Sequence, residues 1–171
     1  MTTVLGIDPG TAITGWGVVR EDAAGQTHIV DYGTIQTPAS APLAQRLRQI
    51  FQGVSDLVTR FQPQTVVVEE VFFSRNVRTA MSVGQARGVV LLAAALADRP
   101  VVEYTPLQVK QAISGYGKAD KAQVQQMTAL LLGLETIPTP DDAADAIAVA
   151  VCHLHSAHLQ NLLAEQTTAE A

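Results

Sequence analysis

The sequence lacks the paired cysteines, the long apolar runs and the basic leader that mark secreted or membrane-embedded chains. Its one cysteine, Cys152, excludes an internal disulfide and is typical of a reducing compartment. The longest apolar segment, residues 89–97, is well short of the roughly 20 residues that cross a membrane. The apolar run at residues 4–7 is too short for a signal peptide and has no basic flank. We therefore expect a cytoplasmic protein without a membrane partner.

Basic side chains are missing from the last part of the chain. All 11 Lys and Arg lie at or before Lys121, together with ten of the acidic residues, and six further acids follow. The net charge of −5 is not that of a typical nucleic-acid-binding protein, although a local basic face is enough for such binding. Charge alone favours a mixed, solvated surface.

The order of apolar patterns predicts an α/β domain with a mixed sheet. Strands are expected near residues 3–8, 14–20 and 27–37, and their short links make them antiparallel. The β-branched run at residues 65–69 is typical of a strand buried on both faces and paired in parallel, and a short fifth strand is expected at 101–104. Helices are expected near residues 41–61, 76–99, 105–113, 121–132 and 141–163. The length and the balanced composition predict one domain over residues 1–163 and a short disordered tail over 164–171.

Several acidic residues stand at the ends of apolar elements. Asp8 ends the first strand before a Pro-Gly turn, and Glu69 ends the buried β-branched strand with Glu70 beside it. Asp142 and Asp145 open the last helix with the i, i+3 spacing that places them on one face. Each acid also has a structural interpretation, since carboxylates cap turns and helix N-termini.

The last helix leaves open which of its acids has a function. Asp141 and Asp145, at i, i+4, could also share a face, and a capping role explains Asp141 and Asp142 easily. It explains Asp145 less well, because an acid in an apolar stripe is costly unless it is paired or binds a cation. Oxygen ligands suit Mg²⁺ or Mn²⁺, and two such ions about 4 Å apart can drive phosphodiester hydrolysis.

Five short motifs occur in a fixed order along most of the chain. They are residues 5–10 with 14–19, then 68–72, 84–88, 108–111 and 142–148. Together they resemble the RuvC family of bacterial Holliday junction resolvases, and the resemblance covers about residues 3–155. It implies a ribonuclease H-like fold, with a five-stranded mixed sheet whose first three strands are antiparallel, flanked by α-helices. It also implies that the catalytic and metal-binding carboxylates are Asp8, Glu69, Asp142 and Asp145, and Asp142 is the least defined because this acid varies in the family.

The resemblance also implies partners and cofactors. The family acts as a homodimer on a four-way DNA junction and cuts two opposing strands symmetrically. It uses Mg²⁺, for which Mn²⁺ can substitute, with two ions in each active site, and it works with the RuvA–RuvB branch-migration complex. The DNA-binding residues expected from the family and from their types are Phe72, Phe73, Arg75, Asn76, Arg78, Lys110, Lys118 and Lys121. Lys118 fills a loop position without a clear family match.

The sequence has three rival interpretations. One is a catalytically idle or differently targeted ribonuclease H-like nuclease, which would lack one of the acids or the phenylalanine after Glu69, and neither is missing here. The stretch at residues 6–11 is also similar to the first phosphate motif of sugar kinases and actin-like ATPases, but these enzymes need two such domains. No Walker A loop is present, so we expect no nucleotide cofactor. A module that binds branched DNA without cutting it is the non-enzymatic alternative. Ala80, Gly84 and Gly88, four residues apart, form a small-residue stripe that could face either the sheet or a second subunit.

Overall fold

A computed structural model describes the backbone of residues 1–70 and 77–169, and the side chains of residues 1–70 and 79–157. Phe72, Phe73, Arg75 and Asn76 lie outside the described residues, as does the side chain of Arg78. The roles assigned to these five residues therefore stay predictions.

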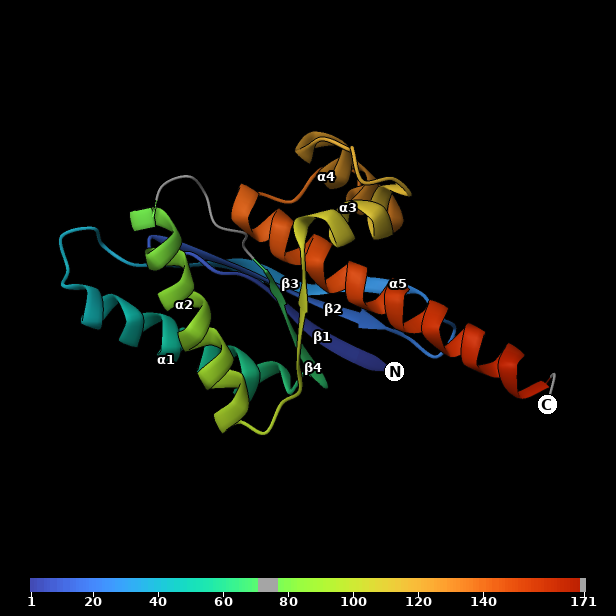
Figure 1. Cartoon of the computed structure of the whole chain (residues 1–171), viewed down its shortest axis with the longest axis horizontal. Coiled ribbons are helices and arrows are strands. Elements are labelled where there is room, and N and C mark those ends of the chain that lie inside the picture. Colours follow the sequence, from blue (N-terminus) through green and yellow to red (C-terminus); the bar gives the residue numbers. More distant parts are fainter. Residues whose placement is uncertain (71–76, 170–171) are drawn as a thin grey trace.

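Five strands form one mixed sheet in the order β3-β2-β1-β4-β5 (Figure 1). The strands are β1 (Thr2–Asp8), β2 (Ile13–Glu21), β3 (Thr27–Gln36), β4 (Thr65–Glu69) and β5 (Val101–Tyr104). The first three are antiparallel, whereas β4 pairs in parallel with both β1 and β5. This arrangement confirms the expected ribonuclease H-like sheet.

Helices cover both faces of the sheet. Figure 1 shows α1 (Leu43–Phe61) and α2 (Val77–Leu96) on one side, and α5 (Asp141–Ala169) with α3 (Pro106–Ser114) and α4 (Lys121–Leu131) on the other. Alternate side chains of β1 point to opposite faces of the sheet. Leu5 packs in the core on the α1 and α2 side, and Val4 packs in the core on the α5 side. The central strands β1 and β4 are therefore buried on both faces, as the β-branched run of β4 predicted for that strand.

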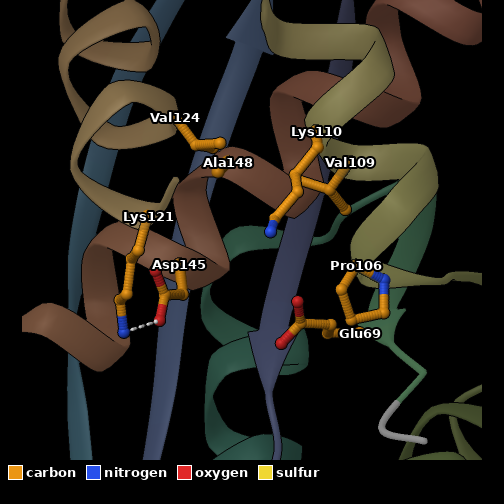
Figure 2. A pocket seen from close by; sticks show the side chains of 8 residues that line it. All are labelled: Glu69, Pro106, Val109, Lys110, Lys121, Val124, Asp145 and Ala148. Atoms are coloured by element: carbon orange, nitrogen blue, oxygen red, sulfur yellow. Dashed lines mark ion pairs between the residues drawn. The ribbon is translucent and has the colours of Figure 1, made fainter. Parts of the chain in front are cut away.

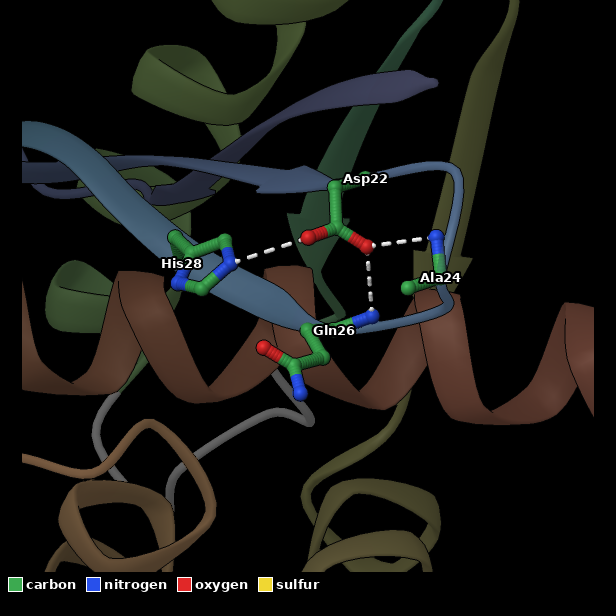
Figure 3. A network of polar contacts seen from close by, with 4 residues as sticks. All are labelled: Asp22, Ala24, Gln26 and His28. Carbon is green, nitrogen blue, oxygen red and sulfur yellow. Dashed lines mark hydrogen bonds and ion pairs between the residues drawn. The ribbon is translucent and has the colours of Figure 1, made fainter.

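The turn between β2 and β3 is held by one carboxylate. Asp22 accepts hydrogen bonds from the backbone N–H of Ala24 at 2.8 Å and of Gln26 at 3.0 Å, and it pairs with His28 at 3.3 Å (Figure 3). The backbone hydrogen bond from Gln26 is the main cause that lowers the pKa of Asp22. This acid therefore has a local structural role in the turn.

Three glycines let α5 lie directly on the sheet. A Cβ atom at Gly6 would overlap the carbonyl oxygen of Ala146, and one at Gly15 would overlap that of Asp142. A Cβ at Gly17 would lie 2.5 Å from the Ile147 side chain. Any larger side chain on this stripe would push the helix outward, so the glycines fix the height of α5 above β1 and β2.

The structure also decides two points that the sequence left open or placed differently. The small-residue stripe of α2 does not face the sheet, because a Cβ atom at Gly84 or Gly88 would meet nothing within 4 Å. Helix α5 continues to Ala169, beyond the boundary expected near residue 163. The division into a domain over 1–163 and a disordered tail over 164–171 stays a prediction.

Candidate active site

The sheet brings Asp8 and Glu69 to the same edge. Strands β1 and β4 are parallel neighbours in which Ile7 pairs with Val68, and each acid is the next residue of its strand. Parallel strands end at the same side of a sheet, so the two carboxylates stand next to each other. The position of both acids was predicted from the apolar runs that precede them.

Helix α5 supplies the other two predicted acids. Gly15 pairs with Asp8 across β1 and β2, and the backbone of Asp142 packs against Gly15. Asp145 follows one turn later, and its side chain is 23% exposed. The close packing of α5 on the glycines therefore places Asp142 and Asp145 beside the ends of β1 and β4.

The other three acids lie close enough to Asp8 for their charges to act on it. Burial, followed by the charges of Glu69, Asp145 and Asp142, raises the pKa of Asp8 to about 8, while Lys121 opposes the rise. The pKa of Glu69 is also raised, by burial first and then by Asp145. Added positive charge would favour the ionised forms of Asp8 and Glu69.

Lys121 provides part of that positive charge. Its Nζ atom lies 2.6 Å from an Asp145 oxygen and also contacts Asp141. Burial disfavours the charged lysine, but the hydrogen bonds from both aspartates raise its pKa above the ordinary value. The side-chain amide of Gln125 donates to Asp141 at 2.6 Å and to Asp145 at 3.3 Å. Asp141 thus serves as a partner for Lys121 and Gln125, which lowers its pKa.

A hollow of about 240 Å³ opens beside the acids. It is lined by Glu69, Pro106, Val109, Lys110, Lys121, Val124, Asp145 and Ala148. Figure 2 shows the Lys110 side chain pointing toward Glu69, and Asp145 turned toward Lys121. Two of the three lysines predicted to contact DNA therefore line the hollow, whereas Lys118 is exposed and is not part of its lining.

Local structure explains how Lys121 reaches the site. The capping box of α4 joins Asp120 and Gln123, whose side chains bond each other's backbone N–H groups. This fixes the start of the helix at Lys121, and Gln125 follows one turn later on the same face. Gln125 was not predicted from the sequence as a residue of the site. Its i, i+4 spacing from Lys121 places both side chains on one helical face and could have identified it.

The donor set fits a hard divalent cation. All four acids offer oxygen ligands, and the raised pKa of Asp8 reflects its burial first and then the negative charge of the neighbouring acids. As the side chains of the described residues stand, no three acidic, histidine or cysteine groups are arranged to hold one ion. Asp145 is engaged by Lys121 instead, so its carboxylate would have to turn from the ammonium to ligate a metal with Asp8 and Glu69.

The fold and the gathered acids define the class of the protein as a ribonuclease H-like nuclease. A family model described as "Crossover junction endodeoxyribonuclease RuvC" matches residues 4–153. The chain therefore belongs to the RuvC family of crossover junction endodeoxyribonucleases. Its activity is accordingly phosphodiester hydrolysis in DNA, in the resolution of Holliday junctions.

Individual relatives support this assignment over nearly the whole chain. RuvC of Syntrophomonas wolfei is 53% identical over 165 residues, which make up 96% of this chain and 95% of the relative. RuvC of Moorella thermoacetica is 59% identical over 150 residues, 88% of this chain and 89% of the relative. The structure of T. thermophilus RuvC in complex with a Holliday junction substrate has a TM-score of 0.89 at 39% identity, covering 94% of this chain and 97% of that one.

Proposed function

We propose that the chain resolves Holliday junctions by metal-dependent hydrolysis, with Asp8, Glu69, Asp142 and Asp145 as the metal-binding carboxylates. The observation that carries this proposal is the convergence of the other three acids on Asp8, whose pKa is raised to about 8. A carboxylate cluster repels a phosphodiester and would oppose cleavage without a neutralising cation. The ions are Mg²⁺, two in each site, with Mn²⁺ as a substitute, and when bound they activate water and stabilise the leaving oxygen.

The chain's own residues then have separate tasks. Asp8 and Glu69, fixed at the ends of paired strands, hold the cation site rigidly against the sheet. Lys110 and Lys121 line the hollow and bind the phosphate group of the DNA strand that enters it. Lys121 also balances the charge of Asp145 until a cation binds.

Residues outside the hollow extend the contact with DNA. Phe72 and Phe73 follow Glu69 in the sequence and offer aromatic surfaces on which an unpaired base can stack. Phosphates of the junction arms are bound by Arg75, Asn76, Arg78 and Lys118. These assignments are supported by residue type and by sequence position next to the site.

The exposed face of α2 is the proposed homodimer surface. Met81, Leu92 and Leu96 are 62%, 53% and 68% exposed, and Gly84 and Gly88 leave open space between them. The segment Thr79–Leu96 of this helix is also long and apolar enough to cross a membrane by length and composition, and only 22% of it is buried. A second copy of the chain would cover this face and present two active sites to opposing strands. We further propose that the dimer works in the cytoplasm with the RuvA–RuvB complex.

The experiment that tests the function uses a synthetic four-way junction. We expect nicks in two opposing strands when Mg²⁺ or Mn²⁺ is present, and intact DNA in EDTA. A linear duplex of the same sequence serves as the control and should remain uncut. Binding of the junction without cleavage under every metal condition would instead favour a DNA-binding module.

A further inference from the structure

A second hollow borders the acid cluster on the side of Asp142. Its volume is about 450 Å³, and it lies between the turn after β1 and the first turns of α2. It is lined by Gly10, Thr11, Ala12, Ile13, Thr79, Ser82, Val83 and Asp142. Glu69 and Asp145 line the first hollow, and Asp142 lines the second, so both hollows border the acid cluster.

Two hydroxyl groups meet at the wall of this second hollow. Thr11 Oγ1 and Ser82 Oγ lie 2.5 Å apart, which joins the turn to α2. One hydroxyl donates to the other, and the accepting hydroxyl keeps a proton that it can donate to a ligand. Because Thr11 is 9% exposed, its side chain has little freedom to leave this arrangement.

The turn that carries Thr11 is held in place by hydrogen bonds that its backbone carbonyl groups accept. The Thr14 hydroxyl donates to the carbonyl of Gly10 at 2.7 Å, and the Thr37 hydroxyl donates to that of Thr11. The backbone N–H of Thr37 donates to the carbonyl of Ala12 at 3.0 Å. The hydroxyl pair is therefore a fixed feature beside the metal-binding acids.

We propose that this hollow binds the sugar-phosphate backbone of the nucleotide next to the scissile phosphodiester, with the accepting hydroxyl of the Thr11–Ser82 pair donating its remaining proton to a phosphate oxygen. The inference rests on the proposed function. The hollow has the volume of a small-molecule site, roughly 300–1,000 Å³. Ile13, which is 39% exposed, and Val83 offer apolar contact to the deoxyribose.

The neutral character of the two donors suits this position. A lysine here would pair with Asp142 in the way that Lys121 pairs with Asp145, and would compete with a cation for the carboxylate. Hydroxyl groups can bind a phosphate oxygen without neutralising the acid beside them. The strand would then be held on both sides of the cluster, by Lys110 and Lys121 in the first hollow and by hydroxyls in the second.

The test replaces single phosphates of the junction by uncharged methylphosphonates, one at a time, on both sides of the scissile bond. With the native chain, one flanking substitution should slow single-turnover cleavage by about tenfold, the effect of losing a hydrogen bond to a charged group. With Ser82→Ala or Thr11→Val, cleavage of the unmodified junction should slow by a similar factor. In these variants the same methylphosphonate should lower the cleavage rate by less than about threefold relative to the unmodified junction.

The control is Ser55→Ala, which removes a half-buried hydroxyl from α1, where it donates to the carbonyl of Phe51. This variant should keep the full methylphosphonate penalty, and thermal unfolding should show that all the variants fold. An unchanged penalty at every flanking position in both hydroxyl variants would overturn the inference while leaving the nuclease function intact. Failure of the native chain to cut the unmodified junction would overturn the proposed function and the inference together.

Discussion

Gly15 and Asp142 are in such close backbone contact that no side chain fits between them. A Cβ atom at position 15 would overlap the carbonyl oxygen of Asp142, at the point where α5 crosses the end of β2. Gly15 also pairs with Asp8 in the sheet. This one contact therefore sets the distance between the acids of the helix and those of the strands.

Gly15→Ala should separate the two halves of the acid cluster. We expect overpacking to lower the free energy of unfolding by about 1–3 kcal/mol. We also expect junction cleavage to fall by about 100-fold, because a shift of about 1 Å in a catalytic group has effects of that size. Chemical denaturation and single-turnover cleavage measure the two effects.

The matched control for this variant is Gly53→Ala on α1, where a Cβ atom would lie 2.7 Å from the end of the Ile35 side chain. It should lower stability without a comparable loss of cleavage. Equal loss of cleavage in the two variants would show that the packing of α5 has no special role.

Stability without metal should depend on pH through Asp8. The folded-state pKa of about 8 lies above the ordinary value of 3.8, so the unfolded chain releases this proton first as pH rises. The free energy of unfolding should therefore fall between about pH 4 and pH 8 and level off above that range. Glu69 and Asp145, whose pKa values are also raised, should act in the same direction.

Asp8→Asn should flatten this pH profile, because the asparagine does not titrate. Saturating Mg²⁺ should stabilise the native chain by about 3 kcal/mol at 100 times its dissociation constant, and most strongly at high pH. Urea unfolding from pH 4 to pH 9 measures both effects. A native profile that rises with pH across this range would contradict the charge arrangement described for the site.

Two variants can show whether Asp142 or Asp141 is the third acid of the site. Asp141 is 61% exposed and holds Lys121 together with Gln125, whereas Asp142 packs against Gly15 beside Asp8. Asp142→Asn should lower cleavage by about 100-fold or more, and Asp141→Asn by less than about tenfold. Rates at saturating Mg²⁺ give the comparison, and the reverse order would assign the site role to Asp141.

Much of this site followed from the sequence because its signals are local. Asp8 and Glu69 each end an apolar strand, and the ribonuclease H-like fold that the family resemblance implied makes these strands parallel neighbours. The contacts of Gly6, Gly15 and Gly17 with α5 could not be predicted, because glycine in a strand indicates close approach without naming the partner.

Tertiary contacts also decided features that sequence patterns left open. Lys121 was expected to contact phosphate, and its ion pairs with Asp141 and Asp145 depend on how α4 packs against α5. The orientation of the Gly84 and Gly88 stripe depends in the same way on the packing of α2. Helix α2 has small residues along much of its length and leucines only near its end, so it has no periodicity that identifies its buried face.

The proposed dimer surface predicts a difference between two exposed leucines. Leu96 on α2 is 68% exposed and Leu130 on α4 is 72% exposed. Leu96→Glu should convert the dimer to a monomer at micromolar concentration, because it places a charge in an apolar interface. Leu130→Glu should leave the dimer intact. Sedimentation velocity measures both, and a monomeric native chain would contradict the proposal.

The most direct test of the metal-dependent mechanism compares the native chain with Asp8→Asn on one four-way junction in Mg²⁺. We predict that the native chain nicks two opposing strands, while the variant binds the junction with similar affinity and leaves every strand intact. Asparagine keeps the size of the side chain but cannot ionise, so it does not offer the charged oxygen with which Asp8 would bind a cation. Continued cutting by a folded Asp8→Asn variant would contradict the account, because Asp8 would then not be a catalytic metal ligand.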